Sequence, residues 1–535
     1  MRAFLAGRMS MEQTADDQSA TVAFLSDVKS YGIDGPVQVH QTHGSFVFLA
    51  GEHAYKLKRA VRFPYMDYST PVRRRRMCER ELVVNQRMAP ALYESVRSIV
   101  KDGAEWRFSS PDDEKAVDWV VVMRRFSQAD LFEEMRKAGR LDISHMLALA
   151  EVIAAFHRDA PIKDSFGGAA GIRAVVEENA AILQNVSPEV LPQSQVATYA
   201  ELSNSWLRNL RPLLGLRRRT GFVRQCHGDL HLNNICMFAG KPTLFDAIEF
   251  ADAFSCIDVA YDLAFILMDL DSHGMRAHAN ALLNRYLECN GDYAGLAALP
   301  LFLACRAAIR AHVAIALQAN AAATKVAPAR LLETAISYLR PDEPRLVVVG
   351  GLSGTGKSML ARSLAPAIGR APGAAVLRSD VIRKAMLHVP QNQRLDASAY
   401  SPSASFLVYD RLLDFAAAAL RAGHSVIADA VFGNDMERNR IETLARDAGV
   451  KLHAFWLSAP RAVLEERIAR RQGDASDADI EVLAAQIRNV SIPEHWSKIS
   501  AARPAATVLA EAEREIGPIR APYAPDGPVT GTLIP

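Results

Sequence analysis

The stretch GLSGTGKS at residues 351–358 has the residue types and spacing of a loop that binds phosphate groups. The pattern G-x-x-x-x-G-K-[ST] allows backbone N–H groups to surround phosphates, and a helix N-terminus behind it adds partial positive charge. The apolar run RLVVVG precedes the loop and a helical pattern follows, which is the context that the motif requires. Its lysine is predicted to reach the β- and γ-phosphates of ATP, and its serine to bind Mg²⁺. The residues predicted to form this ATP site are Gly351, Ser353, Gly354, Thr355, Gly356, Lys357 and Ser358.

Further charged residues follow this loop where a phosphoryl acceptor would bind. Asp380 and Arg383 come just after a short apolar strand. We predict that Asp380 draws the proton from an acceptor hydroxyl and that Arg383 clamps the acceptor, although Asp380 could instead cap a helix. Asp429 ends the next apolar strand and is predicted to lie beside the magnesium ion. In RAVLEERIARRQGDASDAD, a predicted lid, Arg467 and Arg470 or Arg471 could close over the phosphates or form a solvated basic helix.

A second polar constellation lies upstream, in HGDLHLNN at residues 227–234 and FDAIEF at 245–250. The catalytic loop of kinases, H-R-D-L-x-x-x-N, separates its base from a magnesium-binding Asn by the same five positions as Asp229 and Asn234. Asp246 stands in the place of the magnesium-binding Asp of D-F-G. Phosphoryl transfer mainly needs such groups to be positioned and charge to be screened. His231 is interpreted as a residue that stabilises the loop.

A phosphate-binding lysine should precede these residues on a strand and pair with a glutamate on a helix. Lys56 in AYK is the predicted lysine, although Lys58 lies on the same strand face. Glu81 is the predicted partner, with Glu79 as the alternative. The turn THGS before this strand has a single glycine, which departs from the G-x-G-x-x-G loop of protein kinases.

The elements that must position these residues suggest two domains and two tails. The 535 residues are half hydrophobic, with a formal net charge of +2, which is typical of a globular multidomain chain and argues against a broad surface for nucleic acid. The six cysteines form no C-x-x-C pair, which favours reduced thiols in the cytoplasm. No signal peptide is apparent, and the charged residues within the apolar run at 299–319 favour a buried helix over a membrane span. The predicted divisions are a disordered tail (1–22), a kinase-like domain (23–340), a P-loop domain (341–515) and a Pro/Gly-rich tail (516–535).

The first domain should itself be bilobal, an α+β arrangement with a small lobe at about 35–126 and a helical lobe at about 127–340. Short apolar runs predict a meander of antiparallel strands, then a helix at about 70–89 and a hairpin formed by EWRF and AVDWVVVM. The run RRRR at 73–76 is interpreted as a solvated helix face that could also attract an anionic acceptor. The second domain should be α/β, with a parallel sheet flanked by helices. Asp258 and Asp262 are assigned to capping or bracing a helix.

HGDLHLNNI, FDAIEF and DVAYDLA together resemble the aminoglycoside phosphotransferase family over roughly residues 35–320. This resemblance implies a kinase-like fold and phosphorylation of small-molecule hydroxyl groups. Residues 345–515 resemble P-loop kinases of the gluconate-kinase, antibiotic-kinase and polynucleotide-kinase type. The whole chain is similar to a bacterial fusion class that joins the two.

The leading hypothesis is a phosphotransferase with two separate ATP–Mg²⁺ sites and small-molecule acceptors, with no membrane partner. One alternative is a regulatory protein in which one nucleotide site acts as a switch. Another is end-phosphorylation of nucleic acid by the P-loop domain, against which the near-neutral charge and the lack of an aromatic and basic stripe argue. The acceptors and the oligomeric state do not follow from the sequence.

Overall fold

The computed structural model describes residues 16–63, 65–318, 328–470 and 475–517. The chain divides into two compact units, Met1–Ile266 with Cys305–Ala335, and Leu267–Ala304 with Ile336–Pro535. The second unit therefore includes Leu267–Ala304, which was predicted to lie in the helical lobe of the first domain. The predicted fold class is confirmed: an α+β unit with a kinase-like order of elements precedes a P-loop unit with a parallel sheet.

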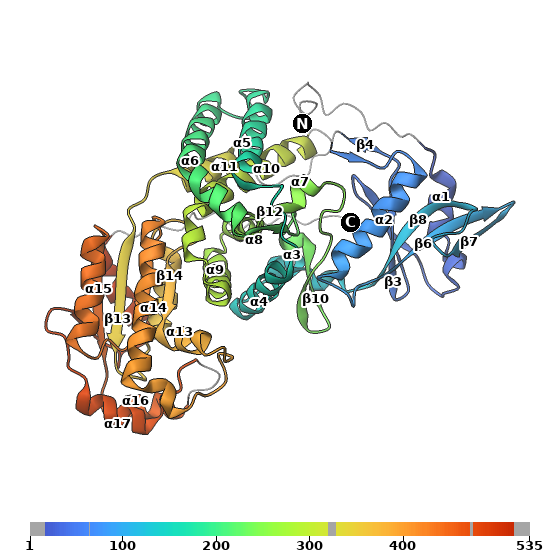
Figure 1. Ribbon diagram of the computed structural model, residues 1–535. Coiled ribbons are helices and arrows are strands. Elements are labelled where there is room, and N and C mark those ends of the chain that lie inside the picture. The colour runs from blue at the N-terminus through green and yellow to red at the C-terminus, as the bar shows by residue number, and fades with distance from the viewer. Residues whose placement is uncertain (1–15, 64, 319–327, 471–474, 518–535) are drawn as a thin grey trace. The chain divides into compact units, whose positions relative to one another are not determined.

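An antiparallel sheet of six strands, in the order β1-β2-β3-β8-β6-β7, forms the small lobe (Figure 1). Alternate residues of its strands face opposite sides, as Ala54 and Leu57 show by joining different apolar clusters. Helix α2 packs on the face of Ala54, to which Lys56 and Lys58 also belong. The strands are β1 (Gln38–Gln41), β2 (Ser45–Ala50), β3 (His53–Lys58), β6 (Tyr93–Asp102), β7 (Glu105–Ser109) and β8 (Ala116–Arg124).

The predicted hairpin between EWRF and AVDWVVVM is wrong. EWRF lies in β7, which pairs with β6, whereas β8 pairs with β3 and β6. The hairpin turns instead at Gly103 and Ala104, between the paired residues Asp102 and Glu105, and Gly103 has a φ of 63°. Glycine is favoured at the first position of such a two-residue turn, because that position needs a positive φ.

Two further sequence expectations for the small lobe need correction. Helix α1 (Ser19–Ser26) begins inside the segment 1–22 that was predicted to be a tail, while residues 1–15 lie outside the described part of the chain. Arg74 of α2 (Pro71–Gln86) is fully buried, so the run at 73–76 is not a solvated face throughout. Its guanidinium pairs with Asp118 at 2.8 Å and with Asp16 at 2.9 Å, because a buried charge requires compensation.

In the helical lobe, the start of α4 is fixed by a capping box between Asp142 and His145. The helices and strands of this lobe up to β12 are α3 (Phe132–Lys137), α4 (Ile143–Asp159), α5 (Gly168–Gln184), α6 (Gln193–Arg219), β9 (Val223–Gln225), β10 (Ile235–Phe238), β11 (Lys241–Leu244), α7 (Asp252–Ser255) and β12 (Cys256–Asp258). The strands form two antiparallel pairs, β10 with β11 and β9 with β12.

Three helices contain the boundaries between the two units: α8 (Val259–Ser272), α10 (Leu299–Gln318) and α11 (Pro328–Leu339). The long apolar run predicted to be a buried helix is α10, and its first ten residues, 299–308, are buried. None of the helices in the described ranges is long and apolar enough to cross a membrane.

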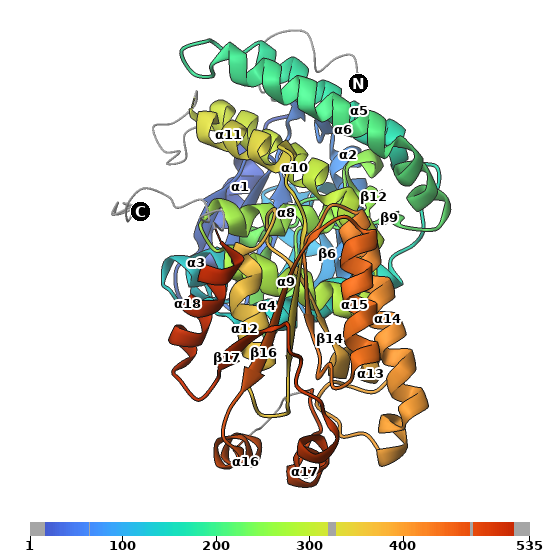
Figure 2. The ribbon, with the colours of Figure 1, turned by 90° about the vertical axis from the view of Figure 1, so that its left-hand side faces the viewer.

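The second unit has a parallel sheet in the order β14-β15-β13-β16-β17. Helices α12 and α18 cover one face, and α14 and α15 cover the other (Figure 2). The strands are β13 (Arg345–Gly351), β14 (Ala375–Arg378), β15 (Val426–Asp429), β16 (Lys451–Ser458) and β17 (Ser497–Ser500). The helices are α12 (Lys357–Leu364), α13 (Ser379–Met386), α14 (Pro402–Arg421), α15 (Asp435–Asp447), α16 (Arg461–Ala469), α17 (Ile480–Asn489) and α18 (Ala505–Ile516).

Helix α9 (Arg276–Asn290) belongs to this second unit because its side chains satisfy the outer edge of β14. The amide oxygen of Asn284 accepts the N–H of Val376 at 2.6 Å, and its amide nitrogen donates to the carbonyl of Ala374 at 3.2 Å. Asn280 donates to the same carbonyl at 3.1 Å. These amides occupy backbone groups at the edge of β14 that would otherwise be free to pair with another strand.

Candidate active sites

Lys56 on β3 is held between two carboxylates in the first unit. Its Nζ lies 2.8 Å from Oε1 of Glu81 on α2 and 2.5 Å from Oδ1 of Asp246. Burial alone would lower the pKa of Lys56, but Asp246 and Glu81 outweigh it and hold that pKa well above its ordinary value. The structure thus brings together the predicted lysine, its helical glutamate and one predicted metal ligand. Glu79, the alternative partner, pairs instead with Arg75.

Lys58 forms a second, deeper ion pair that the sequence did not indicate. Its Nζ lies 2.6 Å from Oε2 of Glu81 and 2.5 Å from Oε1 of Glu249, and Tyr68 donates its hydroxyl proton to the same oxygen of Glu249 at 2.5 Å. Burial opposes ionisation of Glu81, but Lys56 and Lys58 lower the pKa of Glu81 to about 2. Glu81 therefore joins two lysines, of which only Lys56 reaches Asp246.

Asp229 and Asn234 lie together in the loop that precedes β10. The amide nitrogen of Asn234 donates to the Asp229 backbone carbonyl at 2.9 Å and to its Oδ2 at 3.0 Å. His231 Nε2 lies 3.3 Å from the same Oδ2, and its ring also accepts the N–H of Asn233, as its predicted role in stabilising the loop requires. Burial would raise the pKa of Asp229, but the neighbouring His231 and His227 hold it well below its usual value. Asp229 is therefore a carboxylate at neutral pH.

Asp246 is placed next to this loop by backbone hydrogen bonds. The N–H of Phe245 donates to the carbonyl of Asn234 at 3.0 Å, and the N–H of Asp246 donates to the hydroxyl of Tyr93 at 3.0 Å. Asp246 has a φ of 62°, a left-handed conformation that Asp tolerates better than most residues. The oxygens of Asn234 and Asp246 are hard ligands of the kind that Mg²⁺ prefers, so the two residues fit a metal site.

Asp262 of α8 braces the loop that carries Asp229. Its carboxylate accepts the backbone N–H groups of His227 at 3.1 Å and Gly228 at 2.8 Å, and the ring of His157 lies 3.1 Å from it. His157, Cys226 and Asp262 bring possible metal ligands within 4.8 Å of one another. Three N–H groups already occupy the oxygens of Asp262, so we assign the cluster to bracing the loop.

In the second unit, glycines of the phosphate-binding loop after β13 have the positive φ angles that only glycine adopts readily. Gly356, with a φ of 87°, is the N-cap of α12, and Gly351 has a φ of 140°. A side chain at Gly351 would approach the Leu457 carbonyl to 2.5 Å. Lys357 Nζ donates to the carbonyl of Leu352 at 3.0 Å. The side chain of Lys357 therefore turns back onto its own loop.

The hydroxyl of Ser358 donates to Oδ2 of Asp429 at 2.5 Å, so the two predicted magnesium ligands of this unit lie side by side. Nε of Arg378 lies 3.4 Å from the same oxygen. Burial, and then the nearby charge of Asp429, raise the pKa of Asp380 above its ordinary value. Asp380 therefore lies near the charge of Asp429, which contacts Ser358 of the phosphate-binding loop, and ionisable groups with shifted pKa values are frequent at functional sites.

Arg383, which was predicted to clamp the acceptor, is buried, and its side chain contacts residues of its own unit. Its guanidinium donates to the carbonyl of Ala399 at 2.6 Å and lies over the ring of Tyr400 at 4.6 Å. The neighbouring Lys384 pairs with Asp477 at 2.9 Å, a contact that the sequence did not predict. Asp477 also accepts the Tyr400 hydroxyl at 2.7 Å, which ties the segment before α17 to the loop that holds Arg383.

The predicted lid arginines contact groups outside the phosphate-binding loop. Arg467 donates to the carbonyl of Ala501 at 2.8 Å, and Arg470 pairs with Glu466 at 2.8 Å on an exposed helix face. Arg471, the alternative, lies outside the described residues. The loop is contacted instead by Gln486 of α17, whose side-chain oxygen accepts the N–H of Ser353 at 2.8 Å. Nothing in the spacing of Gln486 distinguished it from other polar residues on α17.

A family model matches part of the chain, and uncharacterised relatives match most of it. Residues 346–493 match a family model described as an AAA domain. The uncharacterised protein Rv2004c of Mycobacterium tuberculosis is 31% identical over 457 residues, which cover 84% of this chain and 89% of that protein. The uncharacterised protein Mb2027c of Mycobacterium bovis matches with the same identity and coverage.

Solved structures match each unit with low scores. A choline/ethanolamine kinase family protein from Mesorhizobium loti is 14% identical, has a TM-score of 0.36, and covers 60% of this chain and 92% of its own. A sugar kinase from Janibacter is 20% identical, has a TM-score of 0.25, and covers 32% of this chain and 94% of its own.

The chain is a two-domain fusion of a kinase-like unit and a P-loop unit. It belongs to the family of the mycobacterial protein Rv2004c.

Proposed function

We propose that the chain is an ATP- and Mg²⁺-dependent phosphotransferase with two separate sites, each transferring the γ-phosphoryl group to a hydroxyl group of a small molecule. The observation that carries the proposal is the set of contacts that joins Lys56, Glu81 and Asp246 in the first unit. This set supplies a cation for the phosphates, a residue that orients it and a metal ligand, while Asp229 supplies a base.

In the first site, Lys56 holds the phosphates of ATP and is kept in place by Glu81. Asn234 and Asp246 would hold Mg²⁺, which screens the charge that develops during transfer. Asp229 is ionised and hydrogen-bonded to Asn234, so it can accept the proton of an acceptor hydroxyl as the oxygen attacks. Binding of the acceptor hydroxyl beside Asp229 is the remaining requirement.

In the second site, the loop at 351–358 surrounds the phosphates and Lys357 reaches them. Ser358 and Asp429 would hold Mg²⁺, since their side chains already meet at 2.5 Å. Asp380 is the base of this site. Its raised pKa brings it closer to the pKa of a proton carrier that works near neutral pH.

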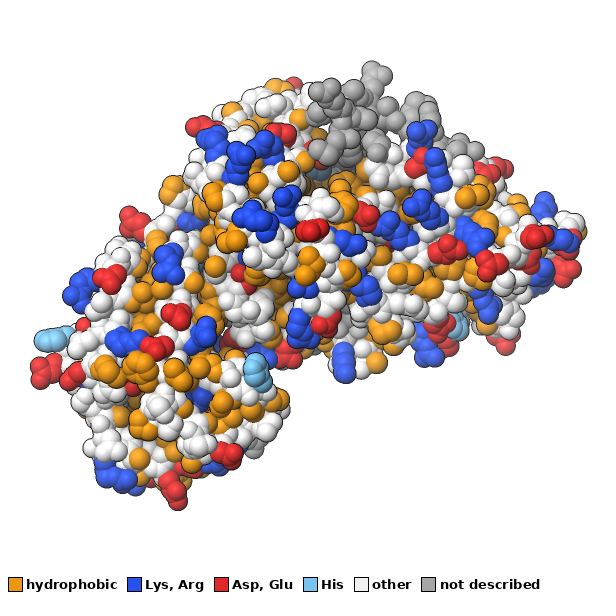
Figure 3. Space-filling model, in the orientation of Figure 1, with side chains coloured by type: hydrophobic (Ala, Val, Ile, Leu, Met, Phe, Trp, Pro, Cys, Tyr) orange, Lys and Arg blue, Asp and Glu red, His pale blue; other side chains and the backbone are white. Residues whose placement is uncertain are grey.

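One observation favours the alternative in which the P-loop unit acts as a nucleotide switch. Gln486 accepts the N–H of Ser353, a group that the loop would offer to a phosphate. Nucleotide binding would then displace Gln486 and release α17. Phosphorylation of nucleic-acid ends receives no such support, and acidic and basic side chains are interspersed over the face shown in Figure 3.

The test is a screen of sugars, amino alcohols, aminoglycosides and oligonucleotide ends for ATP-dependent phosphorylation by the full chain. Variants are better than truncation here, because a cut at residue 341 would remove Leu267–Ala304 from the second unit. Asp229→Ala should abolish transfer to acceptors of the first site and preserve ATP binding, while Lys357→Ala should abolish transfer by the second. Turnover of every acceptor that is unchanged in Asp229→Ala would contradict the proposed first site.

A further inference from the structure

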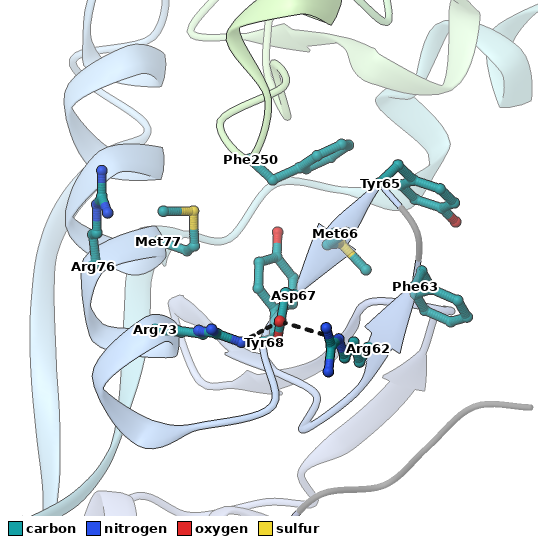
Figure 4. A pocket seen from close by; sticks show the side chains of 10 residues that line it. All are labelled: Arg62, Phe63, Tyr65, Met66, Asp67, Tyr68, Arg73, Arg76, Met77 and Phe250. Atoms are coloured by element: carbon teal, nitrogen blue, oxygen red, sulfur yellow. Dashed lines mark hydrogen bonds and ion pairs between the residues drawn. The ribbon is translucent and has the colours of Figure 1, made fainter. Parts of the chain in front are cut away.

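A pocket of about 510 Å³ lies in the small lobe of the first unit (Figure 4). It is formed by the hairpin of β4 (Arg62–Phe63) and β5 (Met66–Asp67), by the start of α2, and by Phe250. The residues that line it include none of those assigned above to ATP, Mg²⁺ or proton transfer. Its volume is in the range of pockets that bind small molecules.

The pocket carries an excess of positive charge. Three arginines line it, Arg62, Arg73 and Arg76, against a single acid, Asp67. Arg73 pairs with Asp67, and Arg62 lies 3.5 Å from the same carboxylate, so two guanidiniums share one negative charge. The guanidinium of Arg76 makes no hydrogen bond or ion pair with any other residue that the structure describes, and the residue is exposed. Three positive charges and one negative charge leave a net charge of +2, which matches a dianion.

Aromatic rings form the opposite wall. The rings of Phe63 and Tyr65 are stacked, with centroids 5.6 Å apart and planes 7° apart, and the ring of Tyr65 lies 6.1 Å from that of Phe250 (Figure 4). Each of these side chains is only partly buried. Flat, partly exposed rings beside guanidiniums favour a ligand that has a planar ring of its own.

The inner wall connects the pocket to the first candidate site. Tyr68 lines the pocket and donates its hydroxyl proton to Glu249 at 2.5 Å, and Lys58 lies 4.8 Å from the centre of its ring. Lys58 in turn shares Glu81 with Lys56. A buried ion-pair network therefore fixes Tyr68 in this inner wall, so this wall is in place before a ligand binds and needs little ordering on binding.

We propose that this pocket binds a phosphate monoester carried on a planar ring, with the phosphate on Arg76 and Arg73 and the ring against Phe250 and Tyr65. A guanidinium is suited to a phosphate because its N–H groups form paired, charge-assisted hydrogen bonds with phosphate oxygens. The ligand occupies this site in addition to ATP, so its binding does not depend on whether either unit transfers phosphoryl groups.

The test uses phenyl phosphate as the probe, titrated calorimetrically into the full chain. A non-hydrolysable ATP analogue with Mg²⁺ is present throughout to fill the nucleotide sites. Saturable binding is expected, and Arg76→Ala should weaken it by about tenfold or more, as for the loss of a charge-assisted hydrogen bond. Arg75→Ala is the matched control: its guanidinium belongs to the same run of arginines but pairs with Glu79 and does not line the pocket. Binding to this control should stay within about twofold of the parent.

Two further arms separate the ring from the phosphate. Inorganic phosphate, which lacks the ring, should bind more weakly than phenyl phosphate, and Phe250→Ala should remove that difference. Benzyl alcohol, which lacks the charge, should not bind measurably. The proposal is overturned by the absence of saturable binding, by equal affinities in the parent and Arg76→Ala, or by equal losses in Arg75→Ala and Arg76→Ala.

Discussion

Lys58 binds Oε2 of Glu81 at 2.6 Å, while the other oxygen of this carboxylate belongs to Lys56. Two lysines from one face of β3 thus divide a single buried carboxylate between them. Only Lys56 also forms an ion pair with Asp246, whereas Lys58 forms its second ion pair with Glu249. Under the proposed function, the two lysines would have different roles: Lys56 would bind the phosphates of ATP, and Lys58 would hold Glu81 in place.

Lys56→Ala and Lys58→Ala should therefore have different effects. Lys56→Ala should raise the KM for ATP of the first site by about 10- to 100-fold, since it removes a charged donor to the phosphates. Lys58→Ala should change that KM much less, but it leaves the buried Glu249 without its cationic partner and Glu81 with Lys56 alone, so it should destabilise the unit by about 3–5 kcal/mol. Steady-state kinetics and denaturant unfolding measure the two effects. Equal rises in KM, or a larger rise in Lys58→Ala, would contradict the assignment.

The lowered pKa of Glu81 predicts that the stability of the first unit falls at acidic pH. Its folded-state pKa, about 2, lies below its ordinary value of 4.5, so ionised Glu81 stabilises the folded state. This contribution is present above the ordinary pKa and is lost as the pH falls through the folded-state pKa. In denaturant titrations between about pH 5 and pH 2, the parent should lose stability more steeply than Glu81→Gln, which has no carboxylate to protonate. Parallel curves for the two proteins would show that Glu81 does not contribute in this window.

The sequence predicted those site residues whose role depends on a local motif. Lys357, Ser358, Asp229 and Asn234 lie in short patterns that specify the backbone around them, and the structure gives each pattern its expected loop. Glu249 and Gln486 act through contacts with residues more than 130 positions away in the chain, and no local pattern marks such contacts. For the same reason, the sequence did not predict that α9 belongs to the second unit. Its contact with the edge of β14 depends on the amides of Asn280 and Asn284, which would be equally suitable on an exposed helix.

Asp380→Asn distinguishes an enzyme from a switch in the P-loop unit. The substitution keeps the shape of the side chain and removes the carboxylate that would accept the proton. If the unit is a kinase, transfer should fall by about 10²–10⁴-fold, as for the loss of a general base, while the affinity for ATP is preserved. Transfer assays with an acceptor from the screen, together with nucleotide titrations, make the comparison. A variant that matches the parent in every nucleotide assay, with no acceptor found, would favour the switch.

Gln486→Ala should strengthen nucleotide binding to the P-loop unit by a few-fold, because the N–H of Ser353 would no longer have to exchange Gln486 for a phosphate. Ile487→Ala, an exposed neighbour on α17, is the control and should leave the affinity unchanged. Titration with a fluorescent ATP analogue in an Lys56→Ala background isolates this site. Weaker binding in Gln486→Ala would instead mean that Gln486 helps to hold the loop in its binding conformation.

The number of ATP molecules that one chain binds tests the presence of two separate sites most directly. Calorimetric titration of the full chain with a non-hydrolysable ATP analogue and Mg²⁺ should give two equivalents per chain. Lys357→Ala should leave one equivalent, and the Lys56→Ala/Lys357→Ala double variant should retain no tight binding. A single equivalent in the parent, lost entirely in Lys357→Ala, would contradict an ATP site formed by Lys56, Glu81 and Asp246.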